Sequence, residues 1–211
     1  MKSNYTHASV LIDRSLSMSS LRNETITGFN NFIKDQQKED GELTLSLSQF
    51  DDEYEVLHDF VNVHKVNPLT NETFVPRGHT KLLDSLGKLI IETGRKIAEM
   101  HEDQRPEKVI FVITTDGQEN SSREFTTQKI AEMVKHQEEK YNWQFIYLGA
   151  NQDAFSVGTN LGMTGGVNYT ASAGGTRAMY SSLSKNLVSN RKTRSRVDLT
   201  QKDVEEEEKN N

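Results

Sequence analysis

The sequence KVIFVITTDG, residues 108–117, is the stretch that decides the fold. Before its final Asp-Gly pair, the residues are nearly all apolar or β-branched, which is typical of a strand buried on both faces of a parallel sheet. Residues 143–149, WQFIYLG, predict a second strand of this kind. Residues 6–12, THASVLI, predict a third, and it runs directly into Asp13, just as the first runs into Asp116.

Helical patterns lie between these strands. Apolar residues at helical spacing predict helices at residues 19–37, 82–97, 125–140 and from Thr176 onward. Residues 42–63 alternate apolar and polar side chains around an acidic turn, which predicts an antiparallel hairpin at a sheet edge. The order predicts an α/β fold: a doubly wound, mostly parallel sheet with one antiparallel edge strand and helices on both faces.

The length and the charge pattern predict one domain with a tail. A chain of 211 residues fits a single medium domain, which we place at residues 1–190. Residues 191–196, RKTRSR, are basic, and residues 203–208 contain a block of acidic side chains. We therefore expect residues 191–211 to form a flexible charged tail outside the core.

Composition excludes several classes of function. The formal net charge of -6 argues against a nucleic-acid-binding protein, which is usually basic. The absence of cysteine excludes disulfides, zinc–thiolate sites and cysteine nucleophiles. No stretch approaches the roughly 20 apolar residues of a membrane helix, and the first residues lack the apolar core of a signal peptide. We expect no membrane contact and a cytoplasmic location.

Oxygen-bearing side chains follow the predicted strands and precede a predicted helix. They are Asp13, Ser15, Ser17, Thr80 and Asp116. In an open α/β sheet, ligands bind at the carboxyl ends of the strands, so we expect these residues to converge there. Hard oxygen donors without thiolates or a histidine cluster favour Mg²⁺ or Mn²⁺ over zinc. Any one of these residues alone would be interpreted as a helix cap or a turn residue.

With these residues in place, the chain resembles the von Willebrand factor type A domain and its metal-ion-dependent adhesion site. The matching motifs are DRSLS at residues 13–17, Thr80 in GHTKLLDSL and Asp116 in VITTDG, and the resemblance spans roughly residues 5–165. Phage and bacterial cytosolic members are nearer than the secreted ones, since cysteines and a signal are missing. One residue departs from the family: Leu16 stands where glycine is usual.

The resemblance implies a function. In the family the two serines and the threonine bind the metal directly, and the aspartates often act through water. It implies a non-enzymatic, Mg²⁺- or Mn²⁺-dependent protein-binding module, whose ion accepts an Asp or Glu carboxylate from a partner protein. A ring-shaped ATPase or an assembly protein is the partner type that analogy suggests.

Two other functions stay open. The first is a structural or assembly component, for example a phage-encoded one, in which the metal site is secondary. The second, less favoured, is a metal-dependent phosphohydrolase, because Ser15 stands where that chemistry needs a second aspartate. Glu119 and Asn120, beside Asp116, are expected to be solvated loop residues, with a contact at the rim of the site as the alternative. His79, next to Thr80, is expected to pack or to face solvent.

Overall fold

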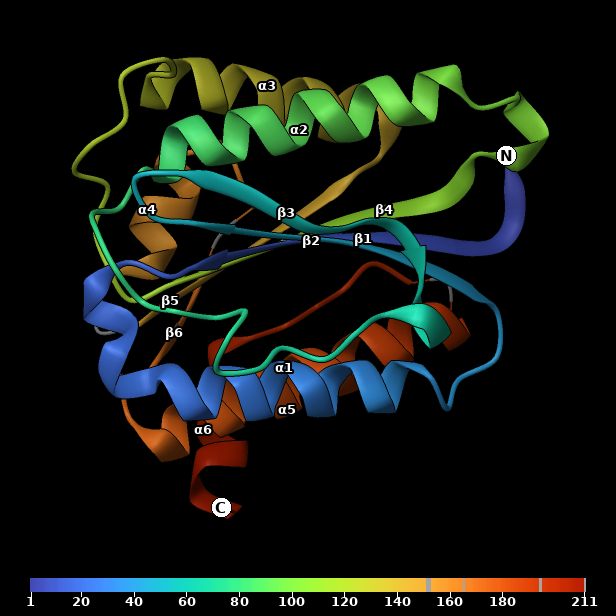
Figure 1. Cartoon of the computed structure of the whole chain (residues 1–211). Coiled ribbons are helices and arrows are strands. Elements are labelled where there is room, and N and C mark those ends of the chain that lie inside the picture. Colours follow the sequence, from blue (N-terminus) through green and yellow to red (C-terminus); the bar gives the residue numbers. More distant parts are fainter. Residues whose placement is uncertain (151–152, 165, 194, 211) are drawn as a thin grey trace.

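The computed structural model describes residues 1–150, 153–164, 166–193 and 195–210. Its centre is a six-stranded sheet with the order β3-β2-β1-β4-β5-β6 (Figure 1). The strands are β1 (Lys2–Asp13), β2 (Glu42–Phe50), β3 (Tyr54–Asn62), β4 (Pro106–Thr115), β5 (Gln144–Ala150) and β6 (Gly166–Tyr169). All neighbouring strands pair in parallel except β2 and β3, which are antiparallel. The predicted sheet, with its antiparallel edge strand, is confirmed.

Helices cover both faces of this sheet (Figure 1). α2 (Leu82–Glu99) and α3 (Thr127–Tyr141) lie on one face, and α1 (Arg22–Gln36) and α5 (Ala173–Thr193) lie on the other. The shorter helices are α4 (Ala154–Asn160), α6 (Gln201–Asn210), η1 (Leu16–Leu21), η2 (Val63–Lys65) and η3 (Glu102–Gln104). Two helix starts differ from the prediction: the tighter turn η1 precedes α1, and α5 begins three residues before Thr176, because Ser172 Oγ accepts the N–H of Gly175 at 3.0 Å.

The core has two halves because the side chains of a strand alternate between faces. On β4, Ile110 and Val112 pack with α1 and α5, whereas Phe111 and Ile113 pack with α2 and α3. All four side chains are fully buried. Burying each of them contributes about 1.5–3 kcal/mol, which explains why this strand has to be apolar at consecutive positions.

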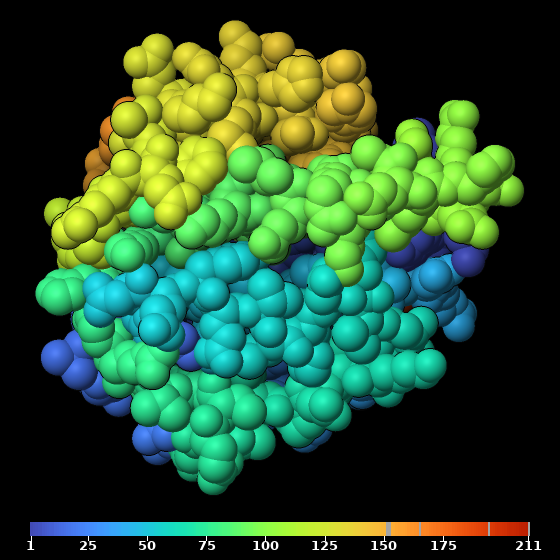
Figure 2. All heavy atoms as spheres, turned by 45° about the horizontal axis from the view of Figure 1, so that its top comes forward, coloured from blue at the N-terminus to red at the C-terminus, as the bar shows by residue number. Residues whose placement is uncertain are grey.

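β3 closes one edge of the sheet and lies at the surface beside α2 (Figure 2). Polar contacts tie it to that helix. Tyr54 Oη donates to Glu92 Oε2 at 2.8 Å, and Lys96 forms an ion pair with Asp59. The β2–β3 hairpin is therefore anchored to the helix that begins just after Thr80.

Residues 191–193 and 195–210, where we expected a tail outside the core, contact the folded domain. Arg191 is buried at the end of α5 and donates to the carbonyl oxygens of Gln36, the last residue of α1, and of Glu39, Asp40 and Gly41 beyond it. In α6, Val204 is only 1% exposed and belongs to the core on that face. The charged composition does not predict this arrangement, because α6 has one apolar side chain and its other contacts with α5 are polar: Glu207 accepts the hydroxyl of Ser181 at 2.6 Å and is paired with Lys185. No helix in the described ranges is both long and apolar enough to cross a bilayer.

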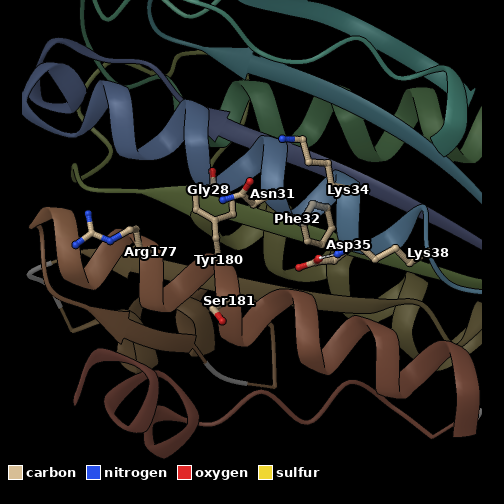
Figure 3. A pocket seen from close by; sticks show the side chains of 9 residues that line it. All are labelled: Gly28, Asn31, Phe32, Lys34, Asp35, Lys38, Arg177, Tyr180 and Ser181. Atoms are coloured by element: carbon tan, nitrogen blue, oxygen red, sulfur yellow. Dashed lines mark hydrogen bonds and ion pairs between the residues drawn. The ribbon is translucent and has the colours of Figure 1, made fainter. Parts of the chain in front are cut away.

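α1 and α5 approach closely at Gly28 (Figure 3). A Cβ at this glycine would lie 2.3 Å from Cδ2 of Tyr180, a ring that is 3% exposed. Beside this contact is a hollow of about 360 Å³, lined by polar groups that include Lys34, Asp35 and Arg177. Gly28 therefore sets the distance between the two helices.

We predict that Gly28→Ala lowers the free energy of unfolding by about 1–3 kcal/mol, because the added methyl group collides with a buried ring. Alanine is the better helix former by about 1 kcal/mol, so the clash has to exceed this gain. Gly94→Ala in α2 is the matched control, since its Cβ would meet only Trp143 Cη2 at 3.8 Å. Urea denaturation of both variants checks this; equal stabilisation by both would contradict it.

Candidate metal centre

The parallel pairing of β1 and β4 brings the ends of the two strands together. Ile12 lies opposite Thr114, so Asp13 and Thr115 are neighbours at the carboxyl edge of the sheet. Asp13 is fully buried and both of its oxygens are engaged. Oδ1 accepts the backbone N–H of Ser15 at 2.6 Å, and Oδ2 accepts the hydroxyl of Thr115 at 2.5 Å. These two bonds fix the direction of the carboxylate.

The two serines of the first loop meet the aspartate of the third. The hydroxyl oxygens of Ser15 and Ser17 are hydrogen-bonded at 3.0 Å, and Ser17 Oγ donates to Asp116 Oδ1 at 2.6 Å. Ser15 is 2% exposed, whereas Ser17 faces solvent. The row of oxygens thus leads from the interior to the surface.

Thr80 joins this group from the second loop. A Cβ at Gly117 would lie 3.0 Å from Thr80 Oγ1, 3.5 Å from Asp13 Oδ2 and 3.6 Å from Ser17 Oγ. One point in space is therefore close to an oxygen from each of these side chains, and only a glycine leaves it free. All five residues singled out in the sequence come together here.

The position of Thr80 depends on two residues that were expected to be merely solvated. Asn120 Oδ1 accepts the N–H of Thr80 at 3.1 Å, and the N–H of Asn120 donates to the carbonyl of Thr80 at 3.2 Å. Glu119 Oε2 accepts the N–H of Leu83 at 2.9 Å, near the start of α2. Their place beside Asp116 was the only sequence signal. Together they hold the second and third loops against each other.

Asp84 strengthens the same junction. Its two carboxylate oxygens accept three consecutive backbone N–H groups, those of Arg123, Glu124 and Phe125, at 2.8–3.0 Å. These bonds lower the pKa of Asp84 against the opposing effect of burial. The segment after Asp116 is therefore fixed to the first turn of α2.

Burial makes the two aspartates of the site costly as anions. Desolvation raises the pKa of Asp13 to about 6, and it also raises the pKa of Asp116, while their hydrogen-bond donors act in the opposite direction. A cation placed between them would offset this cost.

The donor set fits a hard divalent cation. Two carboxylates and three hydroxyls are the oxygen ligands that Mg²⁺ and Mn²⁺ prefer. Within the described ranges, no three His, Cys, Asp or Glu side chains are grouped so that they could hold a metal ion. Any ion at this site would thus depend on the hydroxyl oxygens of Ser15, Ser17 and Thr80 as well as on the carboxylates.

Two residues at the rim face solvent. His79 is paired with Asp52, its Nδ1 lying 3.0 Å from Oδ1 of the carboxylate, and its side chain is 73% exposed. Leu16 is 64% exposed, between the two serines. Its backbone N–H donates to Gly78 at 3.3 Å, and its carbonyl accepts the hydroxyl of Ser19 at 2.6 Å, so the backbone here is held firmly.

Comparison with solved structures identifies the fold. The chain is similar to the ArnB paralog VWA2 from Sulfolobus acidocaldarius (TM-score 0.51, 19% identity, 87% of this chain and 44% of that one). It is similar to proximal thread matrix protein 1 from the mussel byssus, in a structure with a zinc-occupied MIDAS motif (0.55, 18%, 87% and 46%). A third is the vWF domain of the type V pili tip protein Mfa5 from Porphyromonas gingivalis (0.59, 11%, 86% and 94%).

These similarities show that the chain has the von Willebrand factor A fold. The chain spans less than half the length of the first two of these proteins. No protein-family model and no curated protein sequence matches it.

We predict that Asn120→Ala lowers the free energy of unfolding by about 1 kcal/mol, because the N–H of Thr80 loses its acceptor. It also weakens Mn²⁺ binding, since Thr80 is no longer held in place. Asn120→Asp keeps an acceptor oxygen at this position and serves as the control for stability. Thermal denaturation and Mn²⁺ titration check both effects; an alanine variant equal to the wild type in both would refute the role of Asn120.

We predict that Mn²⁺ affinity falls by about tenfold per pH unit below about pH 6. A proton on Asp13, whose pKa is about 6 without a cation, competes with the ion. Thr115→Val removes the hydroxyl that favours the carboxylate, so the loss should begin at a higher pH. Titrations between about pH 7.5 and about pH 5 measure this, and an affinity that does not change over this range would rule out the competition.

Proposed function

We propose that Asp13, Ser15, Ser17, Thr80 and Asp116 hold Mg²⁺ or Mn²⁺ and that the chain binds a partner protein through this ion. The observation that carries the proposal is the point beside Gly117 of the third loop, around which oxygens of Asp13 and Ser17 from the first loop and of Thr80 from the second gather within 3.0–3.6 Å. Hydrogen bonds that tie the three loops to one another also support it.

An ion held there would supply a positive charge that attracts a carboxylate. The chain's own residues do the rest. Asp13 and Ser15 form the buried floor, while Ser17 and the partly exposed Asp116 form the side that faces solvent. A partner's Asp or Glu can thus approach from the loop side only, where Leu16 would lie next to it.

Binding is favoured over phosphoryl chemistry by the state of Asp13. A nucleophilic aspartate needs a free, accessible oxygen. Here the carboxylate is fully buried and both oxygens accept hydrogen bonds, from Ser15 and from Thr115. The five residues therefore support a binding module without bond making, and this module can also serve in an assembly of several proteins.

We predict saturable binding of Mg²⁺ and Mn²⁺ to chelator-treated protein, and a loss of about 10- to 100-fold in affinity in Asp116→Asn. The affinity falls because the neutral amide of asparagine, unlike the carboxylate of Asp116, cannot neutralise the charge of the ion. Asp103→Asn is the matched control, an exposed aspartate of η3. Calorimetric titration measures the three proteins, with Zn²⁺ as a further ion. Wild-type protein that takes up no ion, or an unchanged Asp116→Asn, would refute the metal site.

The carboxylate of the partner is tested on the Mn²⁺-loaded protein. A short peptide with a single glutamate should displace water from the ion and lower its enhancement of water-proton relaxation. The same peptide with glutamine should not. Equal effects of the two peptides would contradict recognition of a carboxylate, even if the metal is bound as proposed.

A further inference from the structure

We propose that Arg14 is a positioning residue of the metal site, which sets the distance between the first and second loops. The inference rests on the proposed metal function. Arg14 lies in the sequence between two candidate ligands, Asp13 and Ser15, yet its side chain is only 5% exposed, and its guanidinium group donates hydrogen bonds to other residues. Burying the positive charge of an arginine beside a cation site is unfavourable unless other contacts compensate for it.

Arg14 binds two carboxylates of the β2–β3 hairpin. Its Nε donates to Asp51 Oδ2 at 2.8 Å, and its Nη1 is paired with Glu55. Asp51 is itself only 1% exposed. In the described part of the chain Nη2 finds no hydrogen-bond partner, so these two carboxylates alone orient the guanidinium group.

Asp51 passes this connection on to the loop that carries Thr80. Arg77 Nε donates to the same oxygen, Asp51 Oδ2, at 2.8 Å, and the N–H of Lys81 donates to the carbonyl of Asp51 at 3.2 Å. Asp51 thus contacts this loop on both sides of Thr80. Since Arg14 of the first loop and Arg77 of the second donate to the same oxygen, the carboxylate of Asp51 joins both loops.

Two backbone hydrogen bonds also join the first and second loops directly. The N–H of Arg77 donates to the carbonyl of Arg14 at 2.8 Å, and the N–H of Leu16 donates to Gly78 at 3.3 Å. The two loops therefore run side by side up to Gly78. The link from Arg14 through Asp51 to Lys81 continues this connection past Thr80, which Asn120 holds from the third loop.

Geometry and charge predict opposite effects for Arg14. A positive charge near the ion repels it, so if Arg14 acted by charge alone, its removal would strengthen metal binding. If it acts by position, its removal weakens metal binding although a positive charge is lost. Lysine keeps the charge but lacks the planar fork that reaches two carboxylates at once. The positioning role therefore predicts weaker binding in both Arg14→Met and Arg14→Lys.

The experiment measures Mn²⁺ affinity for the full chain with Arg14→Lys, Arg14→Met and Asp51→Asn, at a temperature where circular dichroism shows each to be folded. We expect a loss of about tenfold or more in all three variants. Arg191→Lys is the matched control: the same substitution at a similarly buried arginine, at the end of α5, which should lower thermal stability and leave the affinity unchanged.

Three outcomes separate the claims. If Asp116→Asn abolishes binding while Arg14→Lys and Arg14→Met keep the wild-type affinity, the positioning role is wrong and the metal site stands. A stronger affinity of Arg14→Met would show that charge dominates, which also overturns it. If the wild type binds no metal, the proposed function fails, and the role of Arg14 is then decided by a measurement without metal.

That measurement is amide hydrogen exchange. Arg14→Lys should accelerate exchange of the amides of Leu16, Arg77 and Lys81, which bridge the loops, by about tenfold or more, because local opening becomes easier. Arg191→Lys should leave these amides unchanged relative to the rest of the core. Equal protection of the three amides in the wild type and Arg14→Lys would overturn the inference regardless of any ion.

Discussion

The parallel pairing of β1 with β4 is the constraint on which the rest of the structure depends. It places these two strands in the centre of the sheet and ends both at the same edge. Ser17, from the loop after Asp13, thereby donates to Asp116, which is 103 positions from Asp13 in the chain, and oxygens of Ser17 and Asp13 both lie close to Gly117. After β1 the chain forms β2 on one lateral side of β1 and later β4 on the opposite lateral side. The site therefore lies at the point where the strand order reverses, which is where ligands of open α/β sheets bind.

Hydrogen bonds around this pair of strands hold three loops in one arrangement. The backbone N–H of Ser15 and the hydroxyl of Thr115 donate to Asp13, and Asn120, in the third loop, accepts the N–H of Thr80. Buried carboxylates without a cation remain unfavourable as anions, as the raised pKa of Asp13 indicates. The divalent ion that we propose would compete with a proton for the site for this reason.

The fold and the site answer different questions about function. Many activities share a fold, so the von Willebrand factor A architecture by itself assigns no partner. Our proposal of a binding function rests on the five oxygen-bearing residues and on Asp13, whose two buried oxygens both accept hydrogen bonds. Two residues of the first loop have opposite surroundings: Leu16 is exposed at the rim and faces solvent, whereas Arg14 is buried and faces the interior.

The sequence alone determined the α/β class, the antiparallel edge and the five oxygen-bearing residues, because these follow from side-chain periodicity and from polar residues placed at strand ends. Only the tertiary structure decided the roles of Arg14, Asn120 and Arg191. Each is a polar residue in a segment that composition marks as loop or tail, and each acts through partners distant in the sequence. The periodicity of apolar residues in the sequence indicates which side chains are buried against the sheet. The partner of a buried charged side chain depends instead on how helices, strands and loops pack together. For this reason the charged composition of α6 did not predict that it packs on the core, through Val204 and through polar contacts such as that of Glu207 with Ser181.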